Sequence, residues 1–240
     1  MNFCFTVEEL SFIVKHFKYK DLIGFKPQKC KEKNVAQPLE QKGYLRNNNG
    51  KYELPNELRL LFSAWLQVRY TVVREDYWDD ENVFSIMASP KYIISYSEHN
   101  DDINIAICDF SFETMDCILA DYLGLSNIAA NCSGYNYTFA TSDFIDFFGE
   151  NRIDSVSASK KTGLSEKCIN EIVEYISFDD SISLIMQDVE KNIGAMAVIK
   201  YIENSLFMVK HIVPNDDLLK QKVVVVKGDA ESIVNSIYVL

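Results

Sequence analysis

The side chains that could ligate a metal or act as nucleophiles are scattered along this sequence of 240 residues. The three histidines, His16, His99 and His211, have no His or Cys three or four residues away, which a zinc site would need. The six cysteines form no C-x-x-C pair, and Cys117 falls in a predicted helix with no basic residue nearby to activate it. We therefore expect neither a bound metal nor thiol chemistry.

An acidic stretch between two predicted strands, Glu75–Glu81, contains the residues most typical of a binding site. It lacks the central Gly and the ligand spacing of a calcium-binding EF-hand loop. Large aromatic side chains are common anchors in protein interfaces. We therefore predict that Tyr77, Trp78, Asp79 and Asp80 contact a partner. The alternative is that the two aromatic side chains fold back onto the sheet.

The remaining motifs of enzymes are missing from the sequence. None of the nine glycines belongs to a phosphate-binding loop, and no G-x-S-x-G nucleophile motif occurs. The carboxylate pairs Asp101-Asp102 and Asp216-Asp217 fall in predicted turns, where acids usually cap the backbone or face water. We expect a protein without catalytic activity and without a cofactor. An unfamiliar active site would require a cleft with strongly perturbed titratable groups.

Composition and charge restrict the class of protein further. Hydrophobic residues make up 48% of the chain, enough for a large core, but no run reaches the roughly 18 apolar residues of a membrane span. The first residues do not read as a secretory signal peptide, so we expect a cytoplasmic protein. Residues 1–69 carry 12 Lys/Arg and 7 Asp/Glu, a net charge of +5, whereas the rest carries 12 against 28, a net charge of -16. The acidic part should repel nucleic acid.

The sequence of the N-terminal segment predicts two helices, a β-hairpin and a third helix. Thr6 and Glu9 form a capping-box pattern at its start, and Pro38 could delay the beginning of the second helix. The predicted elements are helices Val7–Phe17 and Glu32–Lys42, a β-hairpin from Tyr44 to Leu54 with an Asn-Gly turn, and helix Asn56–Gln67. This order resembles a winged helix. With the basic charge of the segment, it leaves open a transcription regulator with an acidic sensor domain.

Residues 70–240 predict one order of elements twice, which indicates an internal duplication. The first set comprises strands Tyr70–Arg74, Val83–Ala88, Lys91–Tyr96 and Ile103–Cys108, then helix Ser111–Leu123 packed on this meander. The second set comprises strands Ser181–Ile185, Ile193–Ile199, Leu206–Ile212 and Val223–Lys227, then helix Asp229–Leu240. Between the sets we predict helix Ser142–Phe148, a loop at 149–163 and helix Ser165–Ile176.

These elements predict an α+β fold with two pseudo-equivalent halves in one globular unit. The first half covers residues 1–125 and includes the winged-helix-like segment 1–69. A linker rich in small and polar residues follows at 126–138, and the second half covers 139–240. Each half consists of an antiparallel sheet and helices. Because no reactive centre is evident, we expect the surface of this body to carry the function.

The sequence resembles the EspG family of accessory chaperones from type VII (ESX) secretion systems. The resemblance rests on Thr6-Val7-Glu8-Glu9-Leu10, on Gly43-Tyr44-Leu45 and on the duplicated order of elements; the Lys-, Asn- and Ile-rich usage suggests a Gram-positive relative. It implies a pseudo-twofold body, without enzymatic activity, that binds a helical-hairpin secreted protein or its heterodimer in the cytoplasm. It implies neither membrane insertion nor nucleic-acid binding. By analogy, Glu75–Glu81 and the helices of the second half are candidate contacts.

Overall fold

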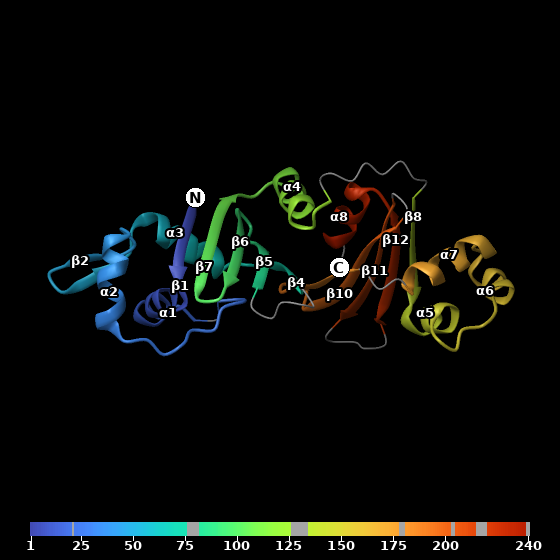
Figure 1. Cartoon of the computed structure of the whole chain (residues 1–240), viewed down its shortest axis with the longest axis horizontal. Coiled ribbons are helices and arrows are strands. Elements are labelled where there is room, and N and C mark those ends of the chain that lie inside the picture. Colours follow the sequence, from blue (N-terminus) through green and yellow to red (C-terminus); the bar gives the residue numbers. More distant parts are fainter. Residues whose placement is uncertain are drawn as a thin grey trace. The chain divides into compact units, whose positions relative to one another are not determined.

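The computed structural model describes the chain apart from residues 21, 76–81, 126–133, 178–180, 203–204, 215–219 and 239–240. The chain divides into two compact units, Met1–Ser111 and Phe112–Leu240 (Figure 1). Each unit combines helices with antiparallel strands, so the fold is α+β, as the sequence predicts. Within the described residues, no helix is long and apolar enough to cross a membrane.

Five described strands of the first unit pair in the order β1-β7-β6-β5-β4. The last four strands along the chain form the predicted meander. Strand β1 is absent from the sequence prediction; it pairs with β7, from Asn2 opposite Ala106 to Thr6 opposite Asp102. The strands are β1 (Asn2–Thr6), β4 (Tyr70–Glu75), β5 (Asn82–Ala88), β6 (Tyr92–His99) and β7 (Asp102–Asp109).

The predicted capping box begins the first helix of this unit. Glu9 N–H donates to Thr6 Oγ1 at 3.1 Å, and Thr6 N–H donates to Glu9 Oε2 at 2.8 Å. The same Glu9 oxygen lies 2.7 Å from Lys42 Nζ, at the end of the next helix, so one buried carboxylate joins two helices. The helices are α1 (Val7–His16), α2 (Glu32–Gln41) and α3 (Asn56–Trp65).

The winged-helix-like order is confirmed. Strands β2 (Arg46–Asn48) and β3 (Lys51–Glu53) form the hairpin. Asn49 and Gly50 have φ values of 52° and 85°, as a two-residue type I′ turn requires. Pro38 does not delay α2, which begins at Glu32 and contains the proline. The buried side chains of this helix hold it in place although Pro38 removes one hydrogen bond.

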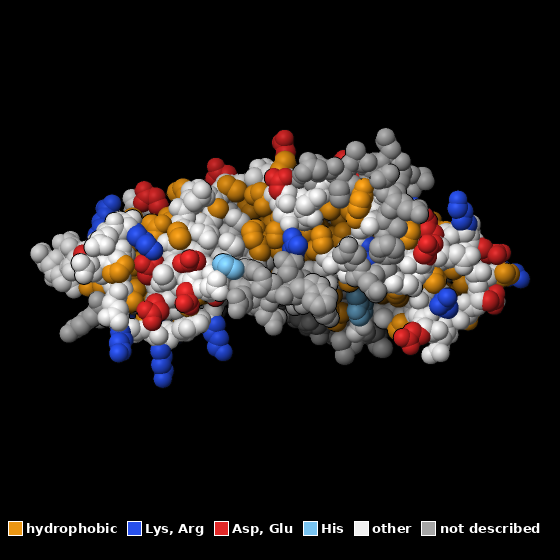
Figure 2. All heavy atoms as spheres, in the orientation of Figure 1, with side chains coloured by type: hydrophobic (Ala, Val, Ile, Leu, Met, Phe, Trp, Pro, Cys, Tyr) orange, Lys and Arg blue, Asp and Glu red, His pale blue; other side chains and the backbone are white. Residues whose placement is uncertain are grey.

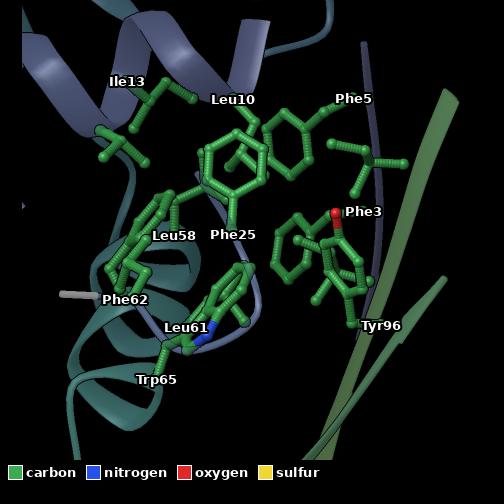
Figure 3. Packing of buried hydrophobic residues seen from close by; sticks show 14 of the residues in the cluster. Phe3, Phe5, Leu10, Ile13, Phe25, Leu58, Leu61, Phe62, Trp65 and Tyr96 are labelled. Carbon is green, nitrogen blue, oxygen red and sulfur yellow. The ribbon is translucent and has the colours of Figure 1, made fainter. Parts of the chain in front are cut away.

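The core of the first unit lies between its helices and one face of its sheet (Figure 3). Trp65 of α3 is 1% exposed, and its indole N–H donates to the Ile23 carbonyl at 2.9 Å. This bond pairs the one polar group of a large buried ring and ties α3 to the segment that follows α1. The labelled side chains of the core include Phe3, Phe5, Leu10, Ile13, Leu58, Leu61, Phe62, Trp65 and Tyr96.

The second unit contains the other five described strands, in the order β9-β10-β11-β12-β8. Helix α4 (Phe112–Tyr122) belongs to this unit and contacts α8. The sequence predicts this helix on the first meander and predicts no contact with α8. The strands are β8 (Tyr135–Ala140), β9 (Ile182–Asp188), β10 (Ile193–Ile202), β11 (Ser205–Pro214) and β12 (Lys222–Gly228). The remaining helices are α5 (Thr141–Phe148), α6 (Ser155–Thr162), α7 (Glu166–Ile176) and α8 (Ala230–Tyr238).

Strands β1 and β8 extend the predicted duplication. Along the chain, each half reads strand, three helices, four-stranded meander and helix, and the first half adds the β2–β3 hairpin. The pairing registers also correspond. Thr6 and Ala140 each precede the first residue of a helix, and each pairs with the first residue of a later strand, Asp102 and Lys222 respectively. The two halves therefore repeat one order of elements, as the sequence predicts.

The prediction of a loop at 149–163 is wrong, because this segment contains helix α6. Asp154 caps this helix by accepting from Ser157 N–H at 3.0 Å, and Gly163 ends it with a φ of 75°. Ala158 is fully buried and anchors the helix. The end of the predicted linker, residues 135–138, belongs to strand β8. Both errors concern segments whose polar composition hides a regular element.

Lys210 of β11 is the most deeply buried charged residue among those described in the second unit. Its side chain is 1% exposed, and Nζ donates to the Ser236 carbonyl in the last turn of α8. A cation at this end of a helix is favourable for the helix dipole. Burial nevertheless lowers the pKa of Lys210 from 10.5 to about 8, because the charged form loses its hydration. The lysine therefore fastens α8 at an electrostatic cost.

We predict that Leu61→Ala lowers the free energy of unfolding by about 2–5 kcal/mol, because it opens a cavity beneath α3. The matched control is Leu66→Ala at the end of the same helix, where the side chain is 48% exposed. This change should cost less than about 0.5 kcal/mol. Urea unfolding followed by circular dichroism measures both values. Equal losses in the two variants would contradict the described core.

We predict that the stability of the wild type rises relative to Lys210→Met between about pH 7.5 and about pH 10. The folded state binds the Lys210 proton less tightly than the unfolded state. The charge penalty is therefore complete below the folded pKa and disappears as pH rises toward the ordinary pKa. The difference should amount to at most about 3 kcal/mol. Paired urea titrations at both pH values measure it, and a pH-independent difference would refute the assignment.

Candidate partner-binding surface

Directly paired residues, four of them apolar and one a histidine, form a row across one face of the strands of the second unit, called the apolar row below. Ile185 pairs with Met196, and Met196 pairs with His211. His211 pairs with Val223, and Val223 pairs with Phe139. Because directly opposed residues of antiparallel strands place their side chains on the same face, these five share one surface. The row runs across all five described strands of the sheet, from β9 to β8.

The row is covered at its β8 end and exposed at its β9 end. Val223 is 3% exposed within the cluster that α5, α6 and α7 form on this face. Phe139 packs edge to face against Phe148 of α5, with 5.4 Å between ring centroids. At the other end, Ile185 is 37% exposed and Met196 is 60% exposed. The end of α7 reaches β10, where Lys200 Nζ donates to the Ile176 carbonyl at 2.8 Å, but the helical layer α5–α7 leaves Ile185 and Met196 exposed to solvent.

A second row on the same face widens the exposed surface. Ser183 pairs with Val198, and Val198 pairs with Val209. Both valines are half-buried. Val209 packs against the covered cluster, whereas Val198 lies on β10 next to the exposed end of the first row. Beyond the α5–α7 layer, Ile185, Met196 and Val198 thus form an exposed apolar surface, called the shelf below. It can accept the apolar face of another element.

His211 marks the boundary between the covered and exposed parts of the row. Its Nε2 lies 3.1 Å from Gln221 Oε1 and 3.3 Å from Thr141 Oγ1. Thr141 is the first residue of α5, so this helix begins beside the exposed shelf. Further along α5, Ile145 is 58% exposed. Asp143 is also exposed on this helix, which therefore presents both apolar and acidic groups to solvent.

An ion pair fastens the helical layer to the sheet. Lys227 of β12 contacts the Glu171 carboxylate of α7, and its Nζ lies 3.3 Å from Tyr175 Oη. The same ammonium lies 5.3 Å from the centre of the Tyr175 ring, within cation–π range. Burial lowers the pKa of Lys227, but its hydrogen bonds to Glu171 and Tyr175 raise the pKa overall. The lysine thus stays charged and holds α7 on β12.

The titratable groups near this ion pair are arranged for packing rather than for reaction. Burial raises the pKa of Cys168, and the Glu171 carboxylate raises it further, so the thiol stays protonated. Burial likewise raises the pKa values of Tyr135 and Tyr175. In the part of the chain that the structure describes, no group of three or more His, Cys, Asp or Glu residues could hold a metal ion. The surface is suited to binding.

The residues predicted from sequence as partner contacts, Tyr77, Trp78, Asp79 and Asp80, lie outside the described residues, between β4 and β5. The apolar row was not predicted. A signal for it exists in Ile182–Met186, where the alternation fails and apolar residues occupy both faces of β9. A strand of this kind needs cover on two sides.

The fold is similar to that of a known secretion chaperone. The structure of the Mycobacterium tuberculosis type VII secretion system chaperone EspG5, in complex with the PE25-PPE41 dimer, covers 100% of this chain and 98% of that chain, with a TM-score of 0.61 and 8% sequence identity. No protein-family model and no curated protein matches the sequence. At this identity the similarity establishes the fold alone. The chain has the fold of a type VII secretion chaperone along its whole length.

Proposed function

We propose that this protein is a non-enzymatic cytoplasmic chaperone that binds helical secreted proteins of a type VII secretion system before export. The observation that carries the proposal is the exposed apolar row at Ile185 and Met196, beside the layer of helices α5–α7. The shared fold with EspG5 supports the same conclusion, because it extends over both halves of the chain. In this proposal the shelf covers an apolar end of the substrate and keeps it soluble.

The chemistry of the shelf suits a helical partner. An amphipathic helix can lay aliphatic side chains on Met196 and Ile185 while its polar face stays in water. The helical layer beside the shelf provides a wall, and the exposed Ile145 provides a further apolar contact on α5. The solved EspG5 complex contains a PE25-PPE41 dimer. For the present chain we propose a helical-hairpin secreted protein or its heterodimer as the occupant.

Charge should select among such partners. Residues 70–240 carry a net charge of -16, and exposed acids such as Asp143 occur on α5 beside the shelf. Carboxylates repel acidic helices and favour a partner whose docking end is neutral or basic. Because these groups are exposed, their effect acts mainly on the association rate and weakens as salt increases.

The alternative function, a winged-helix transcription regulator with an acidic sensor domain, has less support. Among the described side chains of α2, the exposed Asn34, Gln37 and Glu40 bring no positive charge that could contact DNA phosphates. In Figure 2, Lys and Arg side chains of the first unit are interspersed with Asp and Glu and do not merge into one basic patch on this face. Gel-shift binding with a steep salt dependence would favour the regulator over the chaperone.

We predict that Met196→Asp weakens substrate binding about thirtyfold, or by about 2 kcal/mol, because it places a charge in the apolar contact. A photo-crosslinking residue at position 196 should first capture the partner in cells, where mass spectrometry identifies it. Calorimetry with the purified partner then gives the affinity. The melting temperature should stay near that of the wild type, since Met196 is 60% exposed.

The matched control is Leu66→Asp, which introduces the same charge at an exposed apolar residue of the first unit. Its affinity should equal that of the wild type. Equal weakening by both variants would point to a general charge effect instead of a contact at β10. Capture of partners that are not helical secreted proteins would contradict the proposed function itself.

We further predict that Trp78→Ala weakens binding of the same partner by about 1–2 kcal/mol while leaving the melting temperature nearly unchanged. The reason is the typical role of Trp as an interface anchor, as proposed from the sequence for Tyr77, Trp78, Asp79 and Asp80. Lys51→Ala at an exposed position of β3 serves as the comparison, because the change should affect neither the fold nor the binding. A fall in melting temperature with unchanged affinity would instead place Trp78 in the core.

A further inference from the structure

The opposite face of the second sheet contains a cavity of about 520 Å³ beside α8. Lys210 and Ile212 of β11 and Val224 of β12 form part of its floor, and Asn235 of α8 forms part of its wall. Edge strand β8 contributes Thr138, which pairs directly with Val224. The volume falls in the range of small-molecule sites, about 300–1,000 Å³. The cavity therefore has room for a ligand of moderate size.

Lysines are concentrated at this cavity although the surrounding chain is acidic. Lys210, Lys220 and Lys222 line it, and they are three of only 12 basic residues in the segment 70–240, which contains 28 acids. None of the described lining residues is Asp or Glu. Lys220 and Lys222 are exposed at this space, so an anion that enters it gains the attraction of nearby ammonium groups. The lining thus selects for negative charge.

Apolar side chains form the rest of the cavity. Ile193, Ile212, Pro214 and Val224 contribute aliphatic surface between the lysines and the polar residues of α8. A simple inorganic anion would leave this apolar surface exposed to water. An alkyl chain would cover it, and each buried CH₂ group would contribute about 0.8 kcal/mol to the binding free energy. The two kinds of lining together indicate a ligand with an anionic head and an apolar body.

The first unit has a cavity at the corresponding place, and it lacks this charge. That space, about 320 Å³, is lined on β6 and β7 by Ser97 and Asn104. The pairing registers align Thr138, Val224 and Lys210 with Cys4, Asn104 and Ser97 of the first unit. The same alignment places Lys222 at the position of Asp102. The lysines are therefore a property of one half of a duplicated scaffold and not a requirement of the sheet.

We propose that this cavity binds an amphipathic organic anion, with its carboxylate facing the lysines and a medium-length alkyl chain along Ile212 and Val224. Lys222 supplies charge at the mouth of the cavity, where its side chain is exposed. Lys210 supplies charge at the base, where its bond to the Ser236 carbonyl fixes the ammonium beside α8. The site lies on the face opposite the apolar row and does not depend on the proposed chaperone function.

The test is a titration of the ¹⁵N-labelled full-length protein with octanoate, followed by amide chemical shifts. We expect saturable shifts at residues of β8, β11, β12 and α8 that line the cavity. Octan-1-ol, which has the same alkyl chain without the charge, should cause much smaller shifts. Equal responses to both compounds, or octanoate shifts spread over the whole protein, would overturn the proposal.

Two variants of equal charge change make the test specific. Lys222→Gln should weaken octanoate binding by at least about tenfold, because it removes a charge-assisted contact at an exposed position without disturbing the fold. Lys160→Gln in α6 is the control, since α6 lies with the helical layer on the other face. Octanoate affinity should be unchanged in this variant. Similar affinities for both variants would refute a site at the cavity.

Discussion

The structure of the second unit depends on one constraint: its sheet is apolar on both faces. In β10, Ala195, Ala197 and Ile199 face the side of α8 and are almost completely buried, whereas Met196 and Val198 face the side of α5–α7. A strand of this composition must be covered twice, because apolar surface in contact with water is unfavourable. The helical layer α5–α7 covers β8, β12, part of β11 and Lys200 of β10, but it leaves Met196 of β10 and Ile185 of β9 exposed. The exposed shelf is thus the part of a two-sided core that the described chain leaves open.

Duplication explains how the same scaffold carries two different surfaces. Both halves use a strand that leads directly into a helix, and both end in a meander followed by a helix. The side chains between these common elements have diverged. In the first half, Ser97 and Asn104 line a neutral cavity, whereas Lys210 occupies the position of Ser97 in the second half. Because backbone pairing supports the architecture in both halves, side chains on the sheet faces can change without loss of the fold.

Much of the fold could be predicted from sequence because periodicity and caps report local structure. The capping box at Thr6 and the Asn49-Gly50 turn gave correct elements, and each motif fixes its own backbone geometry. Strand β1 is missed in the sequence because the strong helix pattern that begins at Thr6 follows it directly. The sequence of strand β8 resembles a polar linker because of its Asn and Thr, although Tyr135, Tyr137 and Phe139 alternate on its packed face. The sequence of helix α6 is too polar to show a periodic pattern of apolar residues. The helix is stabilised by its Asp154 cap and by the burial of Ala158. The apolar row could not be located from sequence, since it is defined by the register of five strands and by where a layer of helices ends.

Several charged side chains of the described chain join one element to another. Glu9 connects α1 with the end of α2, Glu171 and Lys227 connect α7 with β12, and Lys210 connects β11 with α8. Asp154 and Asp229 cap helices, and hydrogen bonds to Ser157 and Ser232 lower the pKa values of these carboxyls. A general acid or base gains or loses a proton during a reaction. A charged group that joins two elements must instead stay in one protonation state. The groups held in this way fix α7 on β12 and α8 on β11, and so they keep the helices on both faces of these strands in place.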